Sequence, residues 1–265
     1  MSIRVAVAGA AGRMGQEVVC AISGAEGMEL VAAIDRKHVG EDVGELVGIG
    51  NLGVAVADDL ASALRDSRAE VVVDFTVPAS AMGNIQASIE AGVSPVVGTT
   101  GLTPTDVKQV RAWVEDAGIG ALIAPNFAIG AVLMMQFAAQ AAKYLPDVEI
   151  IEFHHENKLD SPSGTALMTA QKIVEGRSGE PIPAPSNPVE KIPGARGAAW
   201  DKIPIHSVRL PGYVAHQEVI FGSLGQTLTL RHDSIDRRSF MPGVVLAVSK
   251  VRSLNGLVVG LEGLL

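Results

Sequence analysis

The most reactive group of side chains lies near the middle of the chain. Two imidazoles, His154 and His155, and one ammonium, Lys158, stand within five residues of one another. Histidine is the side chain best suited to donate a proton near neutral pH, and a lysine beside it can bind a carboxylate or act as an acid. The group follows a run with strand alternation, so we expect a loop to present it to a ligand.

A second feature lies just beyond this group. Ser163 is a favoured helix N-cap, and the backbone amides of Gly164 and Thr165 then form an anion site that uses no charged side chain. Together with the three cationic or proton-donating groups, this indicates a pocket for a small polyanion that takes up a proton. Metal binding by His154 and His155 is the rival interpretation. Adjacent histidines point apart and no third ligand stands at a helical spacing, so we predict no metal site.

The N-terminus carries a candidate phosphate-binding turn, Gly9-Ala10-Ala11-Gly12-Arg13-Met14-Gly15, between a predicted strand and a predicted helix. Gly9 suits the sharp turn, Gly12 lets the backbone approach a pyrophosphate, and Gly15 permits close helix packing. The amides at the helix start attract phosphate. Arg13 is placed to reach the same phosphate, although an exposed surface role is the alternative. The position of the turn predicts a dinucleotide site.

The residues after the second predicted strand bear on the choice of dinucleotide. They are Asp35, Arg36 and Lys37, about 20 residues beyond the glycine turn, where the ribose-binding acidic residue of such sites lies. Asp35 can accept hydrogen bonds from ribose hydroxyls, which favours NAD. Arg36 and Lys37 offer cations to a 2′-phosphate, which favours NADP. The pattern therefore leaves NADH and NADPH both open.

Small and amide-bearing residues follow two later strands. Gly98-Thr99-Thr100-Gly101 and Pro125-Asn126-Phe127 each come directly after an apolar run, and Phe75-Thr76 ends another in the same way. Ligands of open α/β sheets bind beyond the carboxyl ends of the strands. We therefore expect these segments to line the nicotinamide end of the cofactor site, the alternative being ordinary turn chemistry.

The elements that must position these residues differ between the two halves of the chain. The first half alternates apolar runs with helical segments, which predicts parallel strands joined by helices. The predicted strands are Arg4–Ala8, Glu29–Ile34, Val71–Phe75, Pro95–Val97 and Ala121–Ala124. The predicted helices cover Gly12–Ala21, Leu60–Arg65, Pro78–Ala91 and a segment that Thr103 caps and Pro104 begins.

A long apolar helix over Phe127–Leu145 separates this half from the second, which consists of short runs with β-period. These runs are Val148–Phe153, Ile205–Leu210, His216–Phe221 and Thr227–Arg231. The stretch 178–196 is rich in proline and glycine and is expected to be a surface loop. The predicted fold class is α/β, with a Rossmann-type parallel-sheet dinucleotide-binding domain and a smaller α+β domain that has a mixed or antiparallel sheet.

Composition excludes several classes of protein. The 265 residues are 48% hydrophobic, enough for a substantial core, and the formal charge of -8 without a basic block argues against a nucleic-acid partner. No apolar run reaches the roughly 20 residues of a membrane span, and the start of the chain lacks the features of a signal peptide. Cys20 is the one cysteine. We therefore expect a cytoplasmic protein without disulfides.

The string His-His-Glu-Asn-Lys-Leu-Asp-Ser-Pro-Ser-Gly-Thr-Ala, which begins at His154, resembles the signature of the 4-hydroxy-tetrahydrodipicolinate reductases of bacterial and plastid-type lysine biosynthesis. This family is also called dihydrodipicolinate reductases. The resemblance extends to further segments: Gly-Ala-Ala-Gly-Arg-Met-Gly at Gly9, Asp-Phe-Thr at Asp74, Val-Gly-Thr-Thr-Gly at Val97, Pro-Asn-Phe at Pro125, and the region His206 to His232. It departs from some relatives at Asp35, where they carry Glu, and at Pro125, where they carry a smaller residue.

The resemblance implies a reaction and a set of roles. His154 would be the proton donor, and Lys158 a second donor that helps expel the 4-hydroxyl, while NADPH or NADH delivers hydride to C4 of the dehydrated ring. The two carboxylates of the substrate would be held by His155, Lys158, Gly164 and Thr165. The implied cofactor-binding residues are Gly9, Ala10, Ala11, Gly12, Arg13, Met14, Asp35, Arg36, Gly98, Thr99, Thr100, Ala124, Pro125, Asn126 and Phe127.

The family also implies an arrangement of domains and subunits. Residues 1–126 and about 236–265 would bind the dinucleotide, and residues 127–235 would bind the small dicarboxylate and assemble a homotetramer through the C-terminal sheet. A hinge would close the two domains. The implied location is the cytoplasm or a plastid-type stroma, with neither nucleic acid nor membrane as a partner.

Two other functions stay open from the residues alone. A dehydrogenase that oxidises an amino acid or a semialdehyde would share the glycine turn and a lysine, but it would not need paired histidines beside a helix-start anion site. A redox-sensing protein that binds NAD(P)H without turning over a substrate would tolerate His154→Ala and Lys158→Ala.

Overall fold

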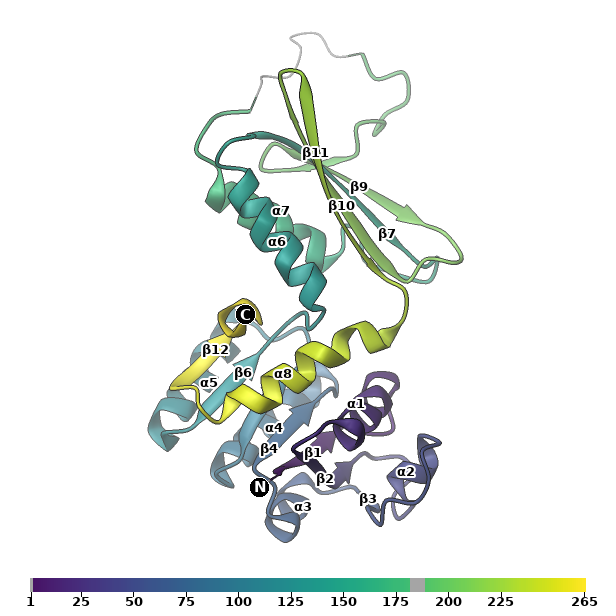
Figure 1. Ribbon diagram of the computed structural model, residues 1–265, viewed down its shortest axis with the longest axis vertical. Coiled ribbons are helices and arrows are strands. Elements are labelled where there is room, and N and C mark those ends of the chain that lie inside the picture. Colours follow the sequence, from purple (N-terminus) through teal and green to yellow (C-terminus); the bar gives the residue numbers. More distant parts are fainter. Residues whose placement is uncertain (1, 182–188) are drawn as a thin grey trace. The chain divides into compact units, whose positions relative to one another are not determined.

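The computed structural model describes residues 2–181 and 189–265, which form two compact units (Figure 1). Unit 1 consists of Met1–Ile129 and Arg237–Leu265, and unit 2 of Gly130–Asp236. The chain thus leaves the first unit, builds the second, and returns. Each unit has its own sheet.

Unit 1 is built on a seven-stranded sheet in which every pair of neighbours is parallel. The strand order is β12-β6-β5-β4-β1-β2-β3, so the direction of winding reverses between β1 and β4. This reversal point is where open parallel sheets bind ligands. The strands are β1 (Ile3–Ala8), β2 (Met28–Ile34), β3 (Val56–Ala57), β4 (Val71–Asp74), β5 (Ser94–Val97), β6 (Gly120–Ile123) and β12 (Gly256–Val259).

Helices cover both faces of this sheet. On one face, α1 (Arg13–Gly24) packs against α8 (Met241–Val251), and on the other lie α3 (Leu60–Ser67), α4 (Pro78–Glu90) and α5 (Pro104–Ala117). The central strands are buried on both sides, which explains their continuous runs of valine and alanine. Thr103 caps α5, as the sequence predicts, and Asp106 completes a capping box by accepting from the backbone N–H of Thr103. The short elements α2 (Val43–Leu46), η1 (Arg237–Phe240) and η2 (Glu262–Leu264) complete the unit.

Unit 2 is a five-stranded mixed sheet in the order β11-β10-β7-β9-β8. Only β7 and β9 pair in parallel; the other neighbours are antiparallel. The strands are β7 (Asp147–His154), β8 (Ala198–Trp200), β9 (Ile203–Arg209), β10 (Ala215–Ser223) and β11 (Gln226–Ser234). The helices α6 (Ile129–Ala141) and α7 (Gly164–Gly176) contribute to one apolar core with β7, β9 and β10.

That core forms on one face of the sheet because side chains alternate along each strand. On β7, Val148, Ile150 and Glu152 are buried, whereas Ile151 and Phe153 point to the opposite face. No helix of the described part of unit 2 packs on that opposite face. The sheet therefore has one covered and one open side.

The predicted fold class is confirmed, and every strand predicted from the sequence is present with ends that differ by a few residues. The α-helices and strands to which sequence reasoning assigned no bounds are the short α2, β3 and β8, and α8 and β12 in residues 241–265. The expected loop over 178–196 contains neither helix nor strand where it is described, and residues 182–188 of it lie outside the described residues. None of the helices in the described ranges is long and apolar enough to cross a membrane.

Candidate active site

The glycine turn after β1 has the geometry of an anion-binding turn. Gly9 has a φ of +82°, and a Cβ there would lie 2.6 Å from the carbonyl oxygen of Phe75. A Cβ on Gly15 would overlap the carbonyl of Gly9, so the helix can approach the turn only with glycine at that position. Gly12 is the N-cap of α1 and offers no side chain to the first amides of the helix. These amides suit a phosphate.

Asp35 connects the end of β2 to this turn. Its Oδ2 accepts a hydrogen bond from the backbone N–H of Ala11 at 3.0 Å, and its Oδ1 accepts one from the N–H of Lys37 at 3.0 Å. The carboxylate is thus oriented beside the turn by two backbone amides. Arg36 and Lys37 extend from the same strand end and are exposed. The acidic group and the two cations that the sequence singles out lie together.

Asp74, at the end of β4, organises the neighbouring loops. Its carboxylate accepts hydrogen bonds from the N–H and Oγ1 of Thr76 at 2.9 and 2.7 Å, from Asn84 at 2.7 Å and from Thr99 Oγ1 at 2.7 Å. Asp74 is 1% exposed. Because the Thr99 hydroxyl is turned toward Asp74, this loop offers a ligand its backbone rather than that hydroxyl.

Two phenylalanines pack beneath the ends of β4 and β6. The rings of Phe75 and Phe127 are 5.6 Å apart between centroids, and a Cβ on Gly98 would overlap the Phe75 ring. Phe127 is buried, with its ring directed at Phe75. The Phe127 side chain therefore packs against Phe75, the residue that follows β4.

The residues expected to bind the cofactor all belong to unit 1, after the carboxyl ends of β1, β2, β5 and β6, but their exposure differs. The exposed residues are Gly12, Arg13, Arg36, Thr100 and Pro125. The partly exposed residues are Gly9, Ala11, Met14, Asp35, Gly98 and Asn126. Ala10, Thr99, Ala124 and Phe127 are buried.

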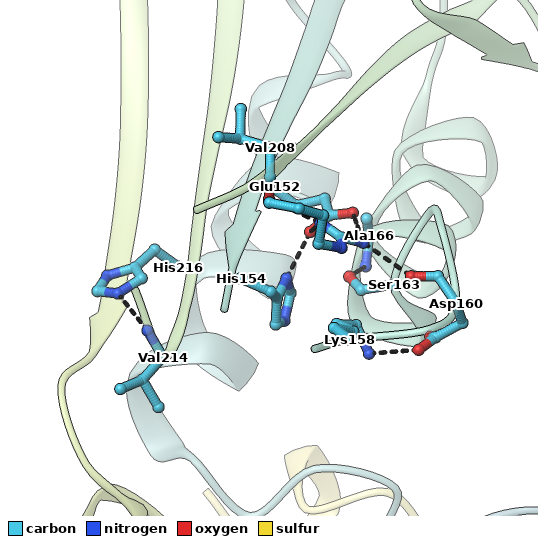
Figure 2. Close-up of polar contacts among 10 residues, drawn as sticks. Glu152, His154, Lys158, Asp160, Ser163, Ala166, Val208, Val214 and His216 are labelled. Atoms are coloured by element: carbon cyan, nitrogen blue, oxygen red, sulfur yellow. Dashed lines mark hydrogen bonds and ion pairs between the residues drawn. The ribbon is translucent and has the colours of Figure 1, made fainter. Parts of the chain in front are cut away.

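His154, the predicted proton donor, lies at the end of β7 in unit 2. His154 and Glu152 are alternate residues of this strand, and His154 Nδ1 lies 2.5 Å from Glu152 Oε2. Glu152 is fully buried, and the His154 side chain is 13% exposed. Figure 2 shows the His154 imidazole directed at the Glu152 carboxylate, and Lys158 paired with Asp160. The strand thus fixes the histidine, and the following loop carries the lysine.

Arg209 completes this cluster from the end of β9. Its Nη1 and Nη2 donate to Glu152 Oε2 and Oε1 at 2.8 and 2.7 Å, and Nη2 also donates to the backbone carbonyl of Asp160 at 2.8 Å. Burial raises the pKa of Glu152, but hydrogen bonds from His154, Arg209 and Ser207 outweigh burial and hold the pKa at about 2. Glu152 is therefore ionised at neutral pH.

Lys158 lies on the loop that follows β7. Its Nζ donates to Asp160 Oδ1 at 2.7 Å, and this hydrogen bond lowers the pKa of Asp160. The backbone N–H of Lys158 donates to the carbonyl of His155, which closes a turn. His155 is exposed, and the Lys158 side chain is 21% exposed. Both are accessible to a ligand.

The helix after this loop begins as the sequence predicts. Ser163 is the N-cap of α7, and its Oγ accepts a hydrogen bond from the backbone N–H of Ala166 at 3.1 Å (Figure 2). The cap therefore uses the third amide of the helix and not those of Gly164 and Thr165. Gly164 is exposed, and a Cβ there would meet nothing within 4 Å.

Sequence reasoning missed three polar partners of this site: Glu152, Arg209 and Asp160. A signal for Glu152 was present, because a glutamate stands on the face of β7 that Val148 and Ile150 bury. For Arg209 there was no local signal, since it is 57 residues from the carboxylate it binds. Among the described residues, no group of three or more His, Cys, Asp or Glu side chains is placed to hold a metal ion.

Comparison with known families accounts for the whole chain. The family model described as "Dihydrodipicolinate reductase, N-terminus" matches residues 3–127, and "Dihydrodipicolinate reductase, C-terminus" matches residues 130–265. The chain belongs to the dihydrodipicolinate reductase family, and it is an oxidoreductase. The resemblance found in the sequence is thus confirmed.

Individual members of the dihydrodipicolinate reductase family align over the full length. The 4-hydroxy-tetrahydrodipicolinate reductase of Desulfitobacterium hafniense is 53% identical over 264 residues, covering 99% of this chain and 98% of its own. That of Geobacillus kaustophilus is 53% identical over 265 residues and covers both chains completely. A solved dihydrodipicolinate reductase from Paenisporosarcina sp. TG-14, described as dipicolinate-bound, superposes with a TM-score of 0.89 at 47% identity, with 100% of each chain covered.

More distant structures share the fold alone. An amine dehydrogenase from Mycobacterium smegmatis has a TM-score of 0.68 at 17% identity, covering 99% of this chain and 96% of its own. Membership of the reductase family indicates a nicotinamide dinucleotide as cofactor.

The Asp74 network predicts a large loss of stability on mutation. Asp74→Ala leaves the buried hydroxyl of Thr99 and the donors of Thr76 and Asn84 without their acceptor, so we expect the free energy of unfolding to fall by about 2–4 kcal/mol. Thr99→Val removes a single bond and should cost about 1 kcal/mol. Urea unfolding of both variants measures the difference, and equal losses would contradict a shared anchor.

Proposed function

We propose that this protein catalyses the NAD(P)H-dependent reduction of 4-hydroxy-tetrahydrodipicolinate to tetrahydrodipicolinate in the diaminopimelate route of lysine biosynthesis. The observation that carries the proposal is the hydrogen-bonded cluster in unit 2 that connects His154 to Lys158 through Glu152, Arg209 and Asp160, on the segment that leads to the helix start at Ser163. This offers a proton donor, a cation and an anion site to one small dicarboxylate. Full-length relatives at 53% identity carry the name of this reductase.

Unit 1 would bind the cofactor, and its residues fit a dinucleotide. The amides after Gly12 would bind the pyrophosphate together with Arg13, and Asp35 would accept hydrogen bonds from the adenosine ribose. Arg36 would contact a 2′-phosphate, so that the enzyme accepts both NADH and NADPH. The turn would be completed by Gly9, Ala10, Ala11 and Met14. The nicotinamide end of the site would be formed by Gly98, Thr99, Thr100, Ala124, Pro125, Asn126 and Phe127.

In unit 2 the substrate would be held by its two carboxylates. His155 and Lys158 supply positive or proton-donating groups, and Gly164 and Thr165 supply backbone amides at the start of α7. Lys158 would protonate the departing 4-hydroxyl so that it leaves as water. The bound cofactor supplies hydride to ring carbon C4. His154 would then donate a proton to the adjacent carbon, and the cationic pocket would stabilise the negative charge that develops on the ring.

We further propose that the protein forms a homotetramer through the open face of the unit 2 sheet. The side chains of Ile151, Phe153 and Ile220 point to this face, which no described helix of unit 2 covers. Light scattering should give four times the 27.5 kDa mass of one chain. A monomeric mass at micromolar concentration would overturn this part of the proposal. The cytoplasmic location expected from the sequence stays a prediction.

The proposed reaction can be tested directly at Lys158. Initial rates are measured from the loss of reduced-nicotinamide absorbance with enzymatically generated substrate. Lys158→Ala should lower kcat by about 10²- to 10⁴-fold, because a positioned proton donor is lost, while the Kd for NADH stays nearly the same. Lys143→Ala, at an exposed lysine of the same unit, is the control and should keep full activity. Absence of turnover by the unmodified enzyme would refute the proposed function.

Gly164 allows a test of the helix-start anion site that changes a single donor. Gly164→Pro removes the backbone N–H at the first helical position, where proline is well tolerated and where Ser163 already has the extended conformation that precedes proline. We expect the KM for substrate to rise about 10-fold or more, as for a lost hydrogen bond to a charged group. Gly164→Ala keeps the amide and is the matched control. If both variants bind substrate as the parent does, the amide is not a ligand.

The contact with a 2′-phosphate is tested at Arg36. Arg36→Ala should weaken NADPH binding about 10-fold and leave NADH nearly unaffected, because only the former carries the additional phosphate. Arg13→Ala should weaken both cofactors alike, since both contain the pyrophosphate. Fluorescence titration with each reduced cofactor gives the ratio, and an unchanged ratio in Arg36→Ala would remove this residue from the proposed contact.

A further inference from the structure

Glu152 is a fully buried carboxylate that touches the proposed proton donor without being able to touch the substrate itself. It lies on β7 with Ile150 before it and His154 after it on the same face of the strand. A buried carboxylate is costly unless cations or N–H groups surround it. Glu152 nevertheless lies on the buried face of β7, beside the apolar Val148 and Ile150, where an apolar side chain would pack without this cost. The carboxylate is therefore expected to have a role other than packing.

The hydrogen bond between Glu152 and His154 determines which imidazole nitrogen carries hydrogen. An ionised carboxylate can only accept hydrogen bonds, so at 2.5 Å from Oε2 the Nδ1 atom must be the donor. With Nδ1–H fixed in this way, the proton that the imidazolium gives up is the one on Nε2. The neutral ring that remains has its hydrogen on Nδ1 and still bonds to Glu152.

Arg209 keeps Glu152 in this role. Its guanidinium binds both carboxylate oxygens and also the backbone carbonyl of Asp160. The contact with the carboxylate keeps Glu152 ionised, so that it does not take the proton of the imidazole. The contact with the Asp160 carbonyl joins the loop that carries Lys158 to the strand that carries His154. The charged groups around His154 in unit 2 are therefore Glu152, Arg209, Lys158 and Asp160.

We infer that Glu152 is a positioning residue for the proposed reduction: it fixes His154 with hydrogen on Nδ1 and so reserves Nε2 for proton transfer to the substrate. This inference rests on the proposed function. In the transfer the Nε2–H bond breaks, its electron pair stays on the nitrogen, and the proton forms a C–H bond at the ring carbon beside the one that receives hydride. Glu152 stays ionised throughout.

Glu152→Gln tests the inference because it keeps the size of the side chain and removes its charge. Arg209 has no acceptor, so it would claim the amide oxygen and leave the amide NH₂ facing His154. Nδ1 must then accept, and the neutral imidazole carries its hydrogen on Nε2. We expect kcat to fall about 100-fold and the alkaline limb of the pH–rate profile to move to lower pH, with the Kd for NADH unchanged.

The chain offers a matched control on the same strand. Glu149 also binds a histidine and an arginine, His206 at 2.9 Å and Arg196, but it points to the opposite face of the sheet. Glu149→Gln removes the carboxylate charge from a cluster of the same composition and should leave kcat and the pH–rate profile unchanged. Parent-like kcat in Glu152→Gln, or equal losses in both variants, would overturn the positioning role.

A spectroscopic measurement tests the hydrogen bond without substrate, and its deciding observation is made on the unmodified protein. In protein labelled with ¹⁵N-histidine, the His154 signals are those that vanish in His154→Asn. Above the pH at which the ring becomes neutral, they should show hydrogen on Nδ1, and in Glu152→Gln on Nε2. Hydrogen on Nε2 in the unmodified protein would overturn the inference. An enzyme with the expected spectra but no turnover would refute only the proposed function.

Discussion

A carboxylate that water cannot reach must be surrounded by hydrogen-bond donors, and each unit of this protein is organised around one such group. Asp74 and Glu152 are the buried acidic residues of the described chain. Asp74 recruits hydroxyls, a backbone amide and an asparagine side chain, whereas Glu152 recruits an imidazole and a guanidinium. Thr76 and Thr99, which bind Asp74, lie on loops that follow strands, and Asn84 lies on α4; His154 and Arg209 are the last residues of β7 and β9, and Arg209 also binds the loop after β7 at the carbonyl of Asp160. The need to satisfy the carboxylate therefore holds those loops in one arrangement.

The hydrogen-bond donors around Asp74 differ from those around Glu152, and the difference matches the chemistry proposed for each unit. The partners of Asp74 are neutral, so the loops it holds present backbone and small side chains, which suit a large cofactor bound mainly through its shape and phosphates. Glu152, in contrast, is bound by a guanidinium and by an imidazole that can become cationic, in addition to the hydroxyl of Ser207. A dicarboxylate and the charge that develops on its ring are attracted to such a cluster. Low internal polarity strengthens both sets of contacts.

Local sequence signals were sufficient for most of the fold and for the groups that would touch ligands. The glycine turn, the Thr103 capping box, the Ser163 cap and the His154 and Lys158 loop are all encoded within a few neighbouring residues. What the sequence could not supply depends on pairing across long separations. Arg209 meets Glu152 only because β7 and β9 pair in parallel, and β3, with two residues, is too short to show a period.

The last strand of unit 1 has a consequence for biosynthesis. β12 supplies the edge beside β6, so residues 256–259 complete a sheet whose other strands lie before residue 124. Unit 2 is contained entirely between these two stretches. During translation, therefore, the inserted unit is fully synthesised while the first still lacks its border strand. The nascent sheet of unit 1 therefore has β6 as an unpaired edge until residues 256–259 have been synthesised.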